Sequence, residues 1–206
     1  MAEGAALPIP YPEVGVVERD TLEEQNEALA AVLPAKPVVL GGCCCAHVGA
    51  VRGLAQRVES LAVVWIDAHG DLNTPETSPS GNLWGMPLRM LIDDGTVAAG
   101  DVALVGARNL DPGETDFLAE TGIDSSLKRA LADADAAYVA LDLDVLDPSD
   151  ADVFMVEPEG ASVEGIEAVL REARERAVIA GVGVTGFRAS ERNVFVITRL
   201  LAAAGL

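Results

Sequence analysis

The sequence is poor in basic residues. It contains 14 lysine and arginine residues against 33 aspartate and glutamate residues, which gives a formal net charge of −19. This charge repels nucleic acid phosphates and anionic membrane headgroups at long range. We therefore expect neither a nucleic acid nor a membrane as a partner. The acidity is typical of a solvated surface that keeps a protein soluble, rather than of a device that attracts a cationic substrate.

Long apolar runs and dispersed cysteines are also missing. No stretch of about 18 consecutive apolar residues occurs in the chain. Residues 1–20 lack the basic segment and apolar core of a secretion signal. The cysteines are confined to Cys43, Cys44 and Cys45, an arrangement unlike the disulfide framework of a secreted protein. These features predict a cytoplasmic protein in a reducing compartment.

No internal repeat, low-complexity linker or heptad pattern divides the sequence. Its 206 residues, 50% of them hydrophobic, suffice for one sizeable core. We expect a single domain over residues 1–206.

Short runs rich in Val and Ile alternate with segments of helical pattern. The strand-like runs lie at 38–42, 61–67, 101–108, 136–144 and 178–187. The helical segments lie at 20–33, 48–61, 86–95, 127–136, 162–177 and 191–204, with Asp20 and Ser162 as expected N-caps. This alternation favours a three-layer α/β/α fold with a mainly parallel sheet covered on both faces. Functional groups in such folds collect at the carboxyl ends of the strands.

Two of the strand-like runs lead into acidic residues. The run at 61–67 leads to Asp67, His69 and Asp71, whose spacing of two places the side chains on one side of an extended segment. The run at 136–144 leads to Asp142 and Asp144. If the two strands are near neighbours, these side chains converge. Two carboxylates about 4 Å apart repel by roughly 4 kcal/mol, so such a cluster needs a cation or extensive proton uptake.

A divalent metal would neutralise this cluster. Carboxylates with one imidazole suit Mn²⁺, Fe²⁺, Zn²⁺ or Ni²⁺ better than Ca²⁺, which prefers oxygen alone. The alternative is that the aspartates only cap turns and helices at strand ends. A D-x-D segment after a strand is also similar to the haloacid dehalogenase phosphatases. That family needs a lysine downstream, whereas Lys36 and Lys128 both precede the segment.

Three separate segments together resemble the arginase, agmatinase and formiminoglutamase family. They are WIDAHGDLNTPETSPSGNLWG at 65–85, VGARNLDPGE at 105–114 and LDLDVLDPSDA at 141–151. The resemblance implies an arginase-like fold in which two Mn²⁺ ions share a bridging hydroxide. By match to the family's D-A-H-x-D and D-x-D segments, five of the six expected metal ligands are Asp67, His69, Asp71, Asp142 and Asp144.

The sixth family ligand is a histidine in a G-G-D-H segment, and Cys44 stands at that position here. Cys44 could bind as a thiolate, which would favour softer metals such as Zn²⁺ or Fe²⁺. Alternatively, His47 could reach the site from one helical turn further on. A third possibility is that Cys44 only fills space and the site holds one ion.

The resemblance also implies residues that contact a substrate. The loop after the first metal segment keeps the family pattern at Asn73, Ser80 and Asn82, and Asp111 stands where arginases hold the substrate's amino group. These positions favour a small polar ligand. The alternative is ordinary loop chemistry, since Asn, Ser and Asp are frequent in turns.

Two departures from the family bear on catalysis. Trp84 replaces a histidine that is thought to shuttle protons, and an indole cannot titrate. We expect Trp84 to contact the substrate instead. Gly186 replaces a glutamate that receives the guanidinium, a charge-assisted pair of about 1.5–3 kcal/mol, so arginine is a doubtful substrate. The chain is also short for the family between 85 and 140, where at least one helix-strand unit is expected to be missing.

These observations predict a ureohydrolase-type enzyme that cleaves a non-peptide C–N bond in a small guanidino, amidino or formimino compound through a metal-bound hydroxide. Asp71 would both bind metal and orient the nucleophile. The metal is expected to be Mn²⁺, as one or two ions, with Zn²⁺, Fe²⁺ or Ni²⁺ as alternatives. The family resemblance implies a homo-oligomer. The competing hypothesis is a catalytically impaired arginase-like protein that binds a metal or small ligand.

Overall fold

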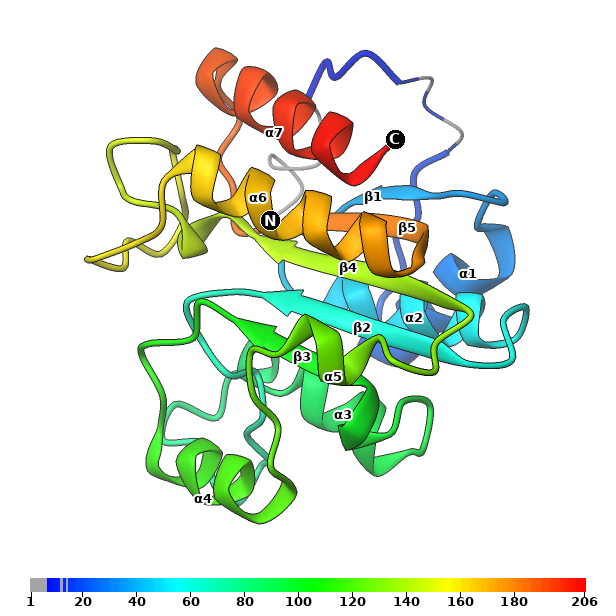
Figure 1. Cartoon of the computed structure of the whole chain (residues 1–206), viewed down its shortest axis with the longest axis vertical. Coiled ribbons are helices and arrows are strands. Elements are labelled where there is room, and N and C mark those ends of the chain that lie inside the picture. Colours follow the sequence, from blue (N-terminus) through cyan, green and yellow to red (C-terminus); the bar gives the residue numbers. More distant parts are fainter. Residues whose placement is uncertain (1–6, 12, 14) are drawn as a thin grey trace.

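Five parallel strands form the central sheet of the computed structural model, which describes residues 7–11, 13 and 15–206. The strands are β1 (Val38–Leu40), β2 (Leu61–Ile66), β3 (Val102–Val105), β4 (Ala136–Asp142) and β5 (Val178–Thr185), in the order β1-β5-β4-β2-β3 (Figure 1). Each lies within one of the predicted strand-like runs. The mainly parallel sheet expected from the sequence is therefore confirmed.

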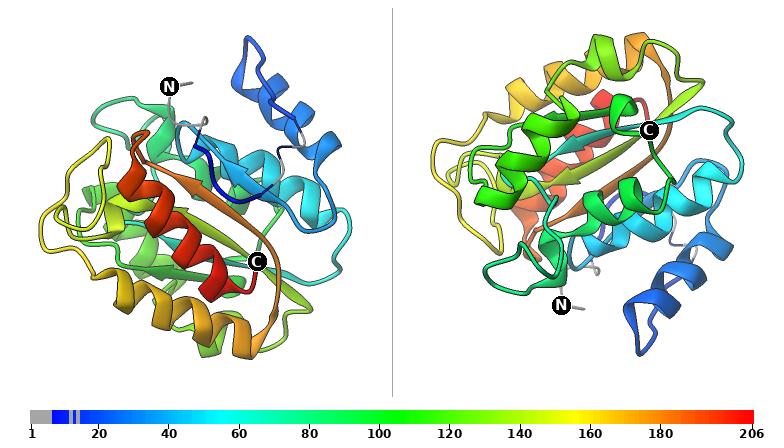
Figure 2. Two further views of the ribbon diagram at one scale, coloured as in Figure 1. Left: turned by 90° about the horizontal axis from the view of Figure 1, so that it is seen from above. Right: turned by 90° about the horizontal axis from the view of Figure 1, so that it is seen from below.

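Helices cover both faces of this sheet. They are α1 (Leu22–Val32), α2 (Cys45–Ala55), α3 (Pro87–Asp93), α4 (Pro112–Thr121), α5 (Leu127–Ala130), α6 (Val163–Arg176) and α7 (Glu191–Ala204). Short 3₁₀ turns are η2 (Leu83–Gly85), η3 (Ala99–Asp101) and η4 (Leu143–Val145). Figure 2 shows α6 and α7 on one side of the sheet and α2 and α3 on the other, which confirms the three layers. None of these helices is long and apolar enough to cross a membrane.

Two hydrophobic clusters separate the layers, because alternate side chains of a strand point to opposite faces. Val64 and Ile66 of β2 lie in one cluster, which α5, α6 and α7 cover. Val63 and Trp65 lie in the other cluster, which α2 and α3 cover. Every residue of β2 and β4 is therefore buried, as expected for a central parallel strand.

Several predicted helix boundaries need correction. The first helix is capped by Thr21, whose Oγ1 accepts a hydrogen bond from the backbone of Glu24, and not by Asp20. The second helix begins at Cys45 rather than at 48, which places Cys44 at its N-cap. The fourth helix, α4, was not predicted, although Pro112 follows an Asp111 cap there. Ser162 caps α6 as predicted.

The strand order brings the two acidic segments together. β2 pairs directly with β4, with Ile66 opposite Leu141, so both strands end at the same edge of the sheet. β5 lies on the other side of β4, with Thr185 opposite Asp142. Part of segment 1–20, in which no secretion signal is expected, lies outside the described residues.

Candidate metal centre

Four buried aspartates and one histidine gather where β2 and β4 end. The exposed fractions are 1% for Asp67, 3% for Asp71, 5% for Asp142 and 4% for Asp144. The side chain of His69 is 20% exposed, so it forms the solvent-facing side of the cluster. Buried carboxylates at this density require protons or a cation to balance their charge.

His69 lies between two of these carboxylates. Its Nδ1 is 3.2 Å from Asp67 Oδ1 and 3.2 Å from Asp144 Oδ2. Its Nε2 is 3.3 Å from Glu157 Oε1, which holds the other edge of the ring. Potential ligand atoms of Asp67, His69 and Asp144 all lie within 4.8 Å of one another, close enough to share one metal ion.

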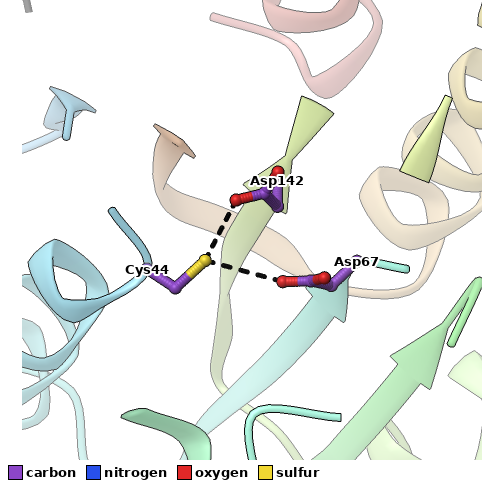
Figure 3. Close-up of side chains that lie close together, drawn as sticks. All are labelled: Cys44, Asp67 and Asp142. Atoms are coloured by element: carbon purple, nitrogen blue, oxygen red, sulfur yellow. Dashed lines mark hydrogen bonds between the residues drawn. The ribbon is translucent and has the colours of Figure 1, made fainter. Parts of the chain in front are cut away.

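Cys44 lies in a second such group. Its Sγ is 3.0 Å from Asp142 Oδ2 and 3.6 Å from Asp67 Oδ2 (Figure 3). These three residues could also hold one ion. Asp67 belongs to both groups, with Oδ1 facing His69 and Oδ2 facing Cys44. Cys44, which stands where the family resemblance places a histidine, thus points at the acids.

His47 does not point at the acids. The residue is 1% exposed. Its Nδ1 is 3.0 Å from the Tyr138 hydroxyl, and its Nε2 is 3.2 Å from Thr185 Oγ1. Burial lowers the pKa of His47 to about 3, so the ring is neutral. The structure therefore gives His47 a place behind the cluster rather than within it.

Asp71 has an unusual backbone and an unpartnered oxygen. Its φ of 53° lies in the left-handed region, which non-glycine residues seldom adopt outside functional sites. Among the described residues, Asp71 Oδ2 is the buried side-chain oxygen or nitrogen that has no hydrogen-bond partner. An unpaired buried acceptor costs about 1–3 kcal/mol. A cation or a bound water would satisfy this oxygen.

The carboxylates of the cluster resist ionisation in the metal-free protein. Burial, with the charge of Asp144 second, raises the pKa of Asp142 to about 7. Burial also raises the pKa of Asp67 and Asp144. The pKa of Asp71 is raised well above its ordinary value by burial and then by the charges of Asp67 and Asp142. A divalent cation would reverse these shifts, since it favours the ionised form of every ligand.

The pKa values of His69 and of the Cys44 thiol are raised as well. Burial opposes the charge on His69, but hydrogen bonds to Asp144 and Asp67 outweigh it and raise its pKa to about 11. Burial, followed by the charges of Asp71 and Asp142, raises the pKa of the Cys44 thiol well above its ordinary value. Without a metal, protons on His69 and Cys44 stabilise the acids. Carboxylate, imidazole and thiol ligands together fit a divalent transition metal.

The residues expected to contact a substrate fall into two groups. Asn73 donates a 2.8 Å hydrogen bond from Nδ2 to Asp111 Oδ2, so these two side chains act as a pair. Ser80 and Trp84 are exposed, and Asn82 is partly buried, on the loop that follows. No hydrogen bond joins these three to Asp111 within the described part of the chain.

Two residues near the acids escaped the sequence prediction. Thr185 is fully buried and donates a 3.0 Å hydrogen bond to Asp142 Oδ2. Glu157 contacts His69 from the loop that follows Asp144. The position of Thr185 at the end of a strand was a usable signal, but only the strand order shows that this strand neighbours β4.

Gly186, where the family resemblance places a glutamate, lies against the carboxylate of Asp142. The residue has a φ of 70°, which favours glycine, and a Cβ at this position would collide with the carboxylate of Asp142. The chain has no room for a side chain at 186 in this conformation. A glutamate at position 186 would therefore need a different local backbone.

Comparison with known proteins identifies the family. The profile of the arginase family matches residues 6–187. The chain belongs to the arginase family. It is 37% identical to an arginase of Bacillus caldovelox over 163 residues, which cover 62% of this chain and 54% of that protein. The chain spans about half the length of the curated relatives it matches.

Solved structures of this family share the fold. An arginase from Bacillus cereus superimposes with a TM-score of 0.80 at 29% identity, covering 89% of this chain and 77% of that one. A formimidoylglutamase from Bacillus subtilis gives a TM-score of 0.76 at 17% identity, covering 89% of this chain and 65% of that one. The second match concerns the fold alone. The resemblance and the arginase-like fold expected from the sequence are confirmed.

Proposed function

We propose that the protein is a metal-dependent hydrolase that cleaves a non-peptide C–N bond in a small guanidino, amidino or formimino compound. Membership of the arginase family supports this class of reaction. The observation that carries the proposal is the unpartnered Oδ2 of Asp71 within a cluster of buried acids. A cluster of this kind is costly to keep in a folded protein unless it binds something.

The proposed metal ligands form two overlapping sets. Asp67, His69 and Asp144 would hold one ion, and Cys44, Asp67 and Asp142 a second, with Asp67 shared between them. Asp71 belongs to neither group, and we propose that its free oxygen completes one of them when metal binds. When bound, a divalent metal supplies a nucleophile at neutral pH and stabilises the charge that develops in the transition state.

The identity of the metal follows from the ligands. Mn²⁺ is the ion that the family resemblance implies, and a site made of carboxylates and one imidazole suits it. A thiolate at Cys44 favours softer ions, so Zn²⁺, Fe²⁺ and Ni²⁺ are the alternatives. We propose one or two ions per chain, with Cys44 deciding whether the second one binds.

Asp71 is the proposed catalytic residue of the chain. Its Oδ2 has no competing partner among the described residues, so it can accept a hydrogen bond from an attacking water and orient that water. Because Trp84 cannot titrate, the proton that reaches the leaving amine would pass through Asp71 or solvent.

The substrate would bind on the solvent side of the acids. The Asn73–Asp111 pair offers a carboxylate and an amide for a small polar group, such as an ammonium. Ser80, Asn82 and Trp84 are proposed to line the approach, with the indole contributing apolar contact. Arginine fits this site poorly, since position 186 has no room for a carboxylate that would pair with the guanidinium.

The location, assembly and domain organisation of the protein are also proposed. A reducing compartment suits the three free cysteines, so we propose a cytoplasmic location. The family resemblance supports a homo-oligomer, and the partner is proposed to be a small molecule rather than nucleic acid or membrane. We also propose that residues 1–206 form one domain, since both hydrophobic clusters pack on one sheet.

A non-catalytic binder is the second candidate. The alternative is supported by three positions at which the chain departs from the family, namely Cys44, Trp84 and Gly186. Such a protein would keep the metal cluster and lose turnover.

Turnover measurements separate the two candidates. The protein is reconstituted with Mn²⁺, Zn²⁺, Fe²⁺ or Ni²⁺ and incubated with guanidino, amidino and formimino compounds, and release of the amine product is followed. We expect hydrolysis of at least one compound, and turnover that is about 10²–10⁴-fold slower in Asp71→Asn. Metal binding without turnover of any compound would favour the non-catalytic binder. Equal turnover by wild type and Asp71→Asn would show that the measured activity does not depend on this site.

A further inference from the structure

Three buried polar side chains lie directly behind the candidate metal centre. His47 is 1% exposed, and Tyr138 and Thr185 are 0% exposed. Hydrogen bonds link the Tyr138 hydroxyl to His47 Nδ1 at 3.0 Å and His47 Nε2 to Thr185 Oγ1 at 3.2 Å. Thr185 Oγ1 is in turn 3.0 Å from Asp142 Oδ2. A continuous chain of hydrogen bonds therefore ends on a proposed metal ligand.

The direction of this chain follows from hydrogen-bond capacity. Within the described part of the molecule, the Tyr138 hydroxyl has His47 Nδ1 as its one hydrogen-bond partner. Leaving the hydroxyl hydrogen unpaired in a buried site would cost about 1–3 kcal/mol, so Tyr138 donates and Nδ1 accepts. The proton of the neutral ring is then on Nε2 and is donated to Thr185. Thr185 is left to donate its own hydrogen toward Asp142.

The surroundings leave space for this arrangement and little else. A Cβ at position 183 would collide with the Tyr138 hydroxyl and with the ring of His47, so a glycine is needed there. Trp65 contacts the His47 ring edge to face, at a centroid separation of 5.1 Å and an interplanar angle of 75°. The ring is thus held on several sides and cannot turn freely.

We propose that His47 is a positioning residue for the metal centre, and that Tyr138 sets its tautomer. By occupying a lone pair of Thr185, the Nε2 proton of His47 directs the Thr185 hydroxyl at the ligand pair Asp142 and Cys44. Thr185 Oγ1 is 3.3 Å from Cys44 Sγ, so the same hydroxyl reaches both ligands. The opposite tautomer would draw the Thr185 hydrogen to Nε2, so Asp142 Oδ2 would lose the hydrogen bond from Thr185. This inference rests on the proposed metal-dependent function.

Nuclear magnetic resonance tests the direction of the chain without any metal. The protein has two histidines, so ring-¹⁵N-labelled protein gives two imidazole patterns, and His69→Asn assigns the one that belongs to His47. We expect a neutral His47 ring with its proton on Nε2. A proton on Nδ1, or a charged ring, would overturn the inference.

Metal titration tests the positioning role. The probe is Co²⁺, followed by absorption, with thermal unfolding of each variant as the folding control. Partners of metal ligands typically contribute about 10–100-fold to metal affinity, so we expect Thr185→Val to weaken Co²⁺ binding by about that factor. His47→Met should weaken binding in the same direction. His47→Gln keeps an amide donor and should bind nearly as well as the wild type.

A double variant decides whether His47 acts through Thr185. The Co²⁺ affinity of His47→Met/Thr185→Val should equal that of Thr185→Val alone, because the pair forms one pathway. Additive losses, or unchanged affinity in Thr185→Val, would overturn the positioning role while leaving the proposed function intact. If His47→Met fails to fold, the comparison of His47→Gln with Thr185→Val still tests the role. Absence of Co²⁺ binding by the wild type would overturn the inference and the proposed function together.

Discussion

At the scale of single residues, the centre consists of groups that are unfavourable alone and compatible only as a set. Asp71 illustrates this, since burial and the charges of Asp67 and Asp142 raise its pKa while its Oδ2 lacks a partner. A residue in this state weakens the folded protein and strengthens ligand binding, a trade-off common at functional sites.

Asp71→Asn should separate these two effects. We expect turnover in the preferred metal to fall by about 10²–10⁴-fold, the range for loss of a positioned acid–base group. The metal-free variant should be no less stable than the wild type, because burial and the neighbouring acids disfavour the ionised carboxyl that the substitution removes. Steady-state kinetics and thermal unfolding give the two numbers. Marked destabilisation of the metal-free variant would mean that the Asp71 carboxylate has a structural partner.

Cys44 should set the preference among metals. Cys44→His restores an imidazole at the family's ligand position, so we expect a shift of preference from Zn²⁺ toward Mn²⁺. Cys44→Ser keeps the size of the side chain but offers a poor ligand, and should weaken Zn²⁺ binding. Competition titrations with the two ions measure the ratio of affinities. Identical ratios in all three proteins would show that the thiol is not a ligand.

The raised pKa values predict how the stability of the metal-free protein depends on pH. Burial raises the pKa of Asp142 from its ordinary value of 3.8 to about 7, so the folded state binds more protons than the unfolded state between these values. Stability contributed by this group is present at low pH and falls as the pH rises from about 4 to about 7, by up to about 1.4 kcal/mol per pH unit for one proton.

His69 extends this loss to higher pH. Its folded pKa of about 11 exceeds the ordinary histidine value of 6.5, so its contribution to stability is full below pH 6.5 and is lost as the pH rises through 11. Urea unfolding of metal-free protein across this range tests both groups. Bound metal should abolish the acidic part of the slope, and a stability that rises between pH 4 and 7 would contradict the assignment.

At the scale of elements, hydrogen bonds hold the loops of the centre against the ends of the strands. Arg108 follows β3 and donates hydrogen bonds to the backbone oxygens of Asp144, Glu157 and Pro158, at 2.9, 3.1 and 2.8 Å. One guanidinium thus joins the turn that carries Asp144 to the loop that carries Glu157. The planar fork of arginine can make these contacts together, whereas an ammonium cannot.

Arg108→Lys should therefore loosen the loop and the site together. We expect a loss of about 1–3 kcal/mol in the free energy of unfolding, together with weaker metal binding. Arg176→Lys is a matched control, because Arg176 makes only an exposed ion pair with Glu172. Urea unfolding and metal titration give the measurements. Equal effects of the two substitutions would show that Arg108 does not organise the loop.

The order of the strands in the sheet could not be predicted from the sequence. Apolar runs followed by Asp67 and by Asp142 were enough to predict parallel strands with acids at their ends. The sequence did not predict that these two strands are neighbours, because neither segment indicates which strand it pairs with. The place of Thr185 depends on β5 lying beside β4, a non-local pairing that periodicity cannot reveal. For the same reason, the sequence leaves His47 open as an alternative ligand and does not show that it lies behind Thr185.

At the scale of the whole molecule, the four buried aspartates of the centre have a different role from most of the other acidic residues. Most of the 33 acidic residues leave the net charge at −19 and act through solubility, but the four aspartates of the centre are buried. The fold places these four at one edge of the sheet, where strands from separate parts of the chain end together. Composition predicted an acidic surface, whereas the segments around the aspartates predicted the family.

Metal content per chain is the most direct measurement of the central claim. The protein is purified without added metal, reconstituted with Mn²⁺, Zn²⁺, Fe²⁺ or Ni²⁺, and analysed beside an Asp67→Asn/Asp142→Asn variant treated identically. We expect one or two tightly bound ions per wild-type chain in at least one condition, with most of that metal missing from the variant. Wild-type protein that retains no metal in any condition, while remaining folded, would contradict the metal centre.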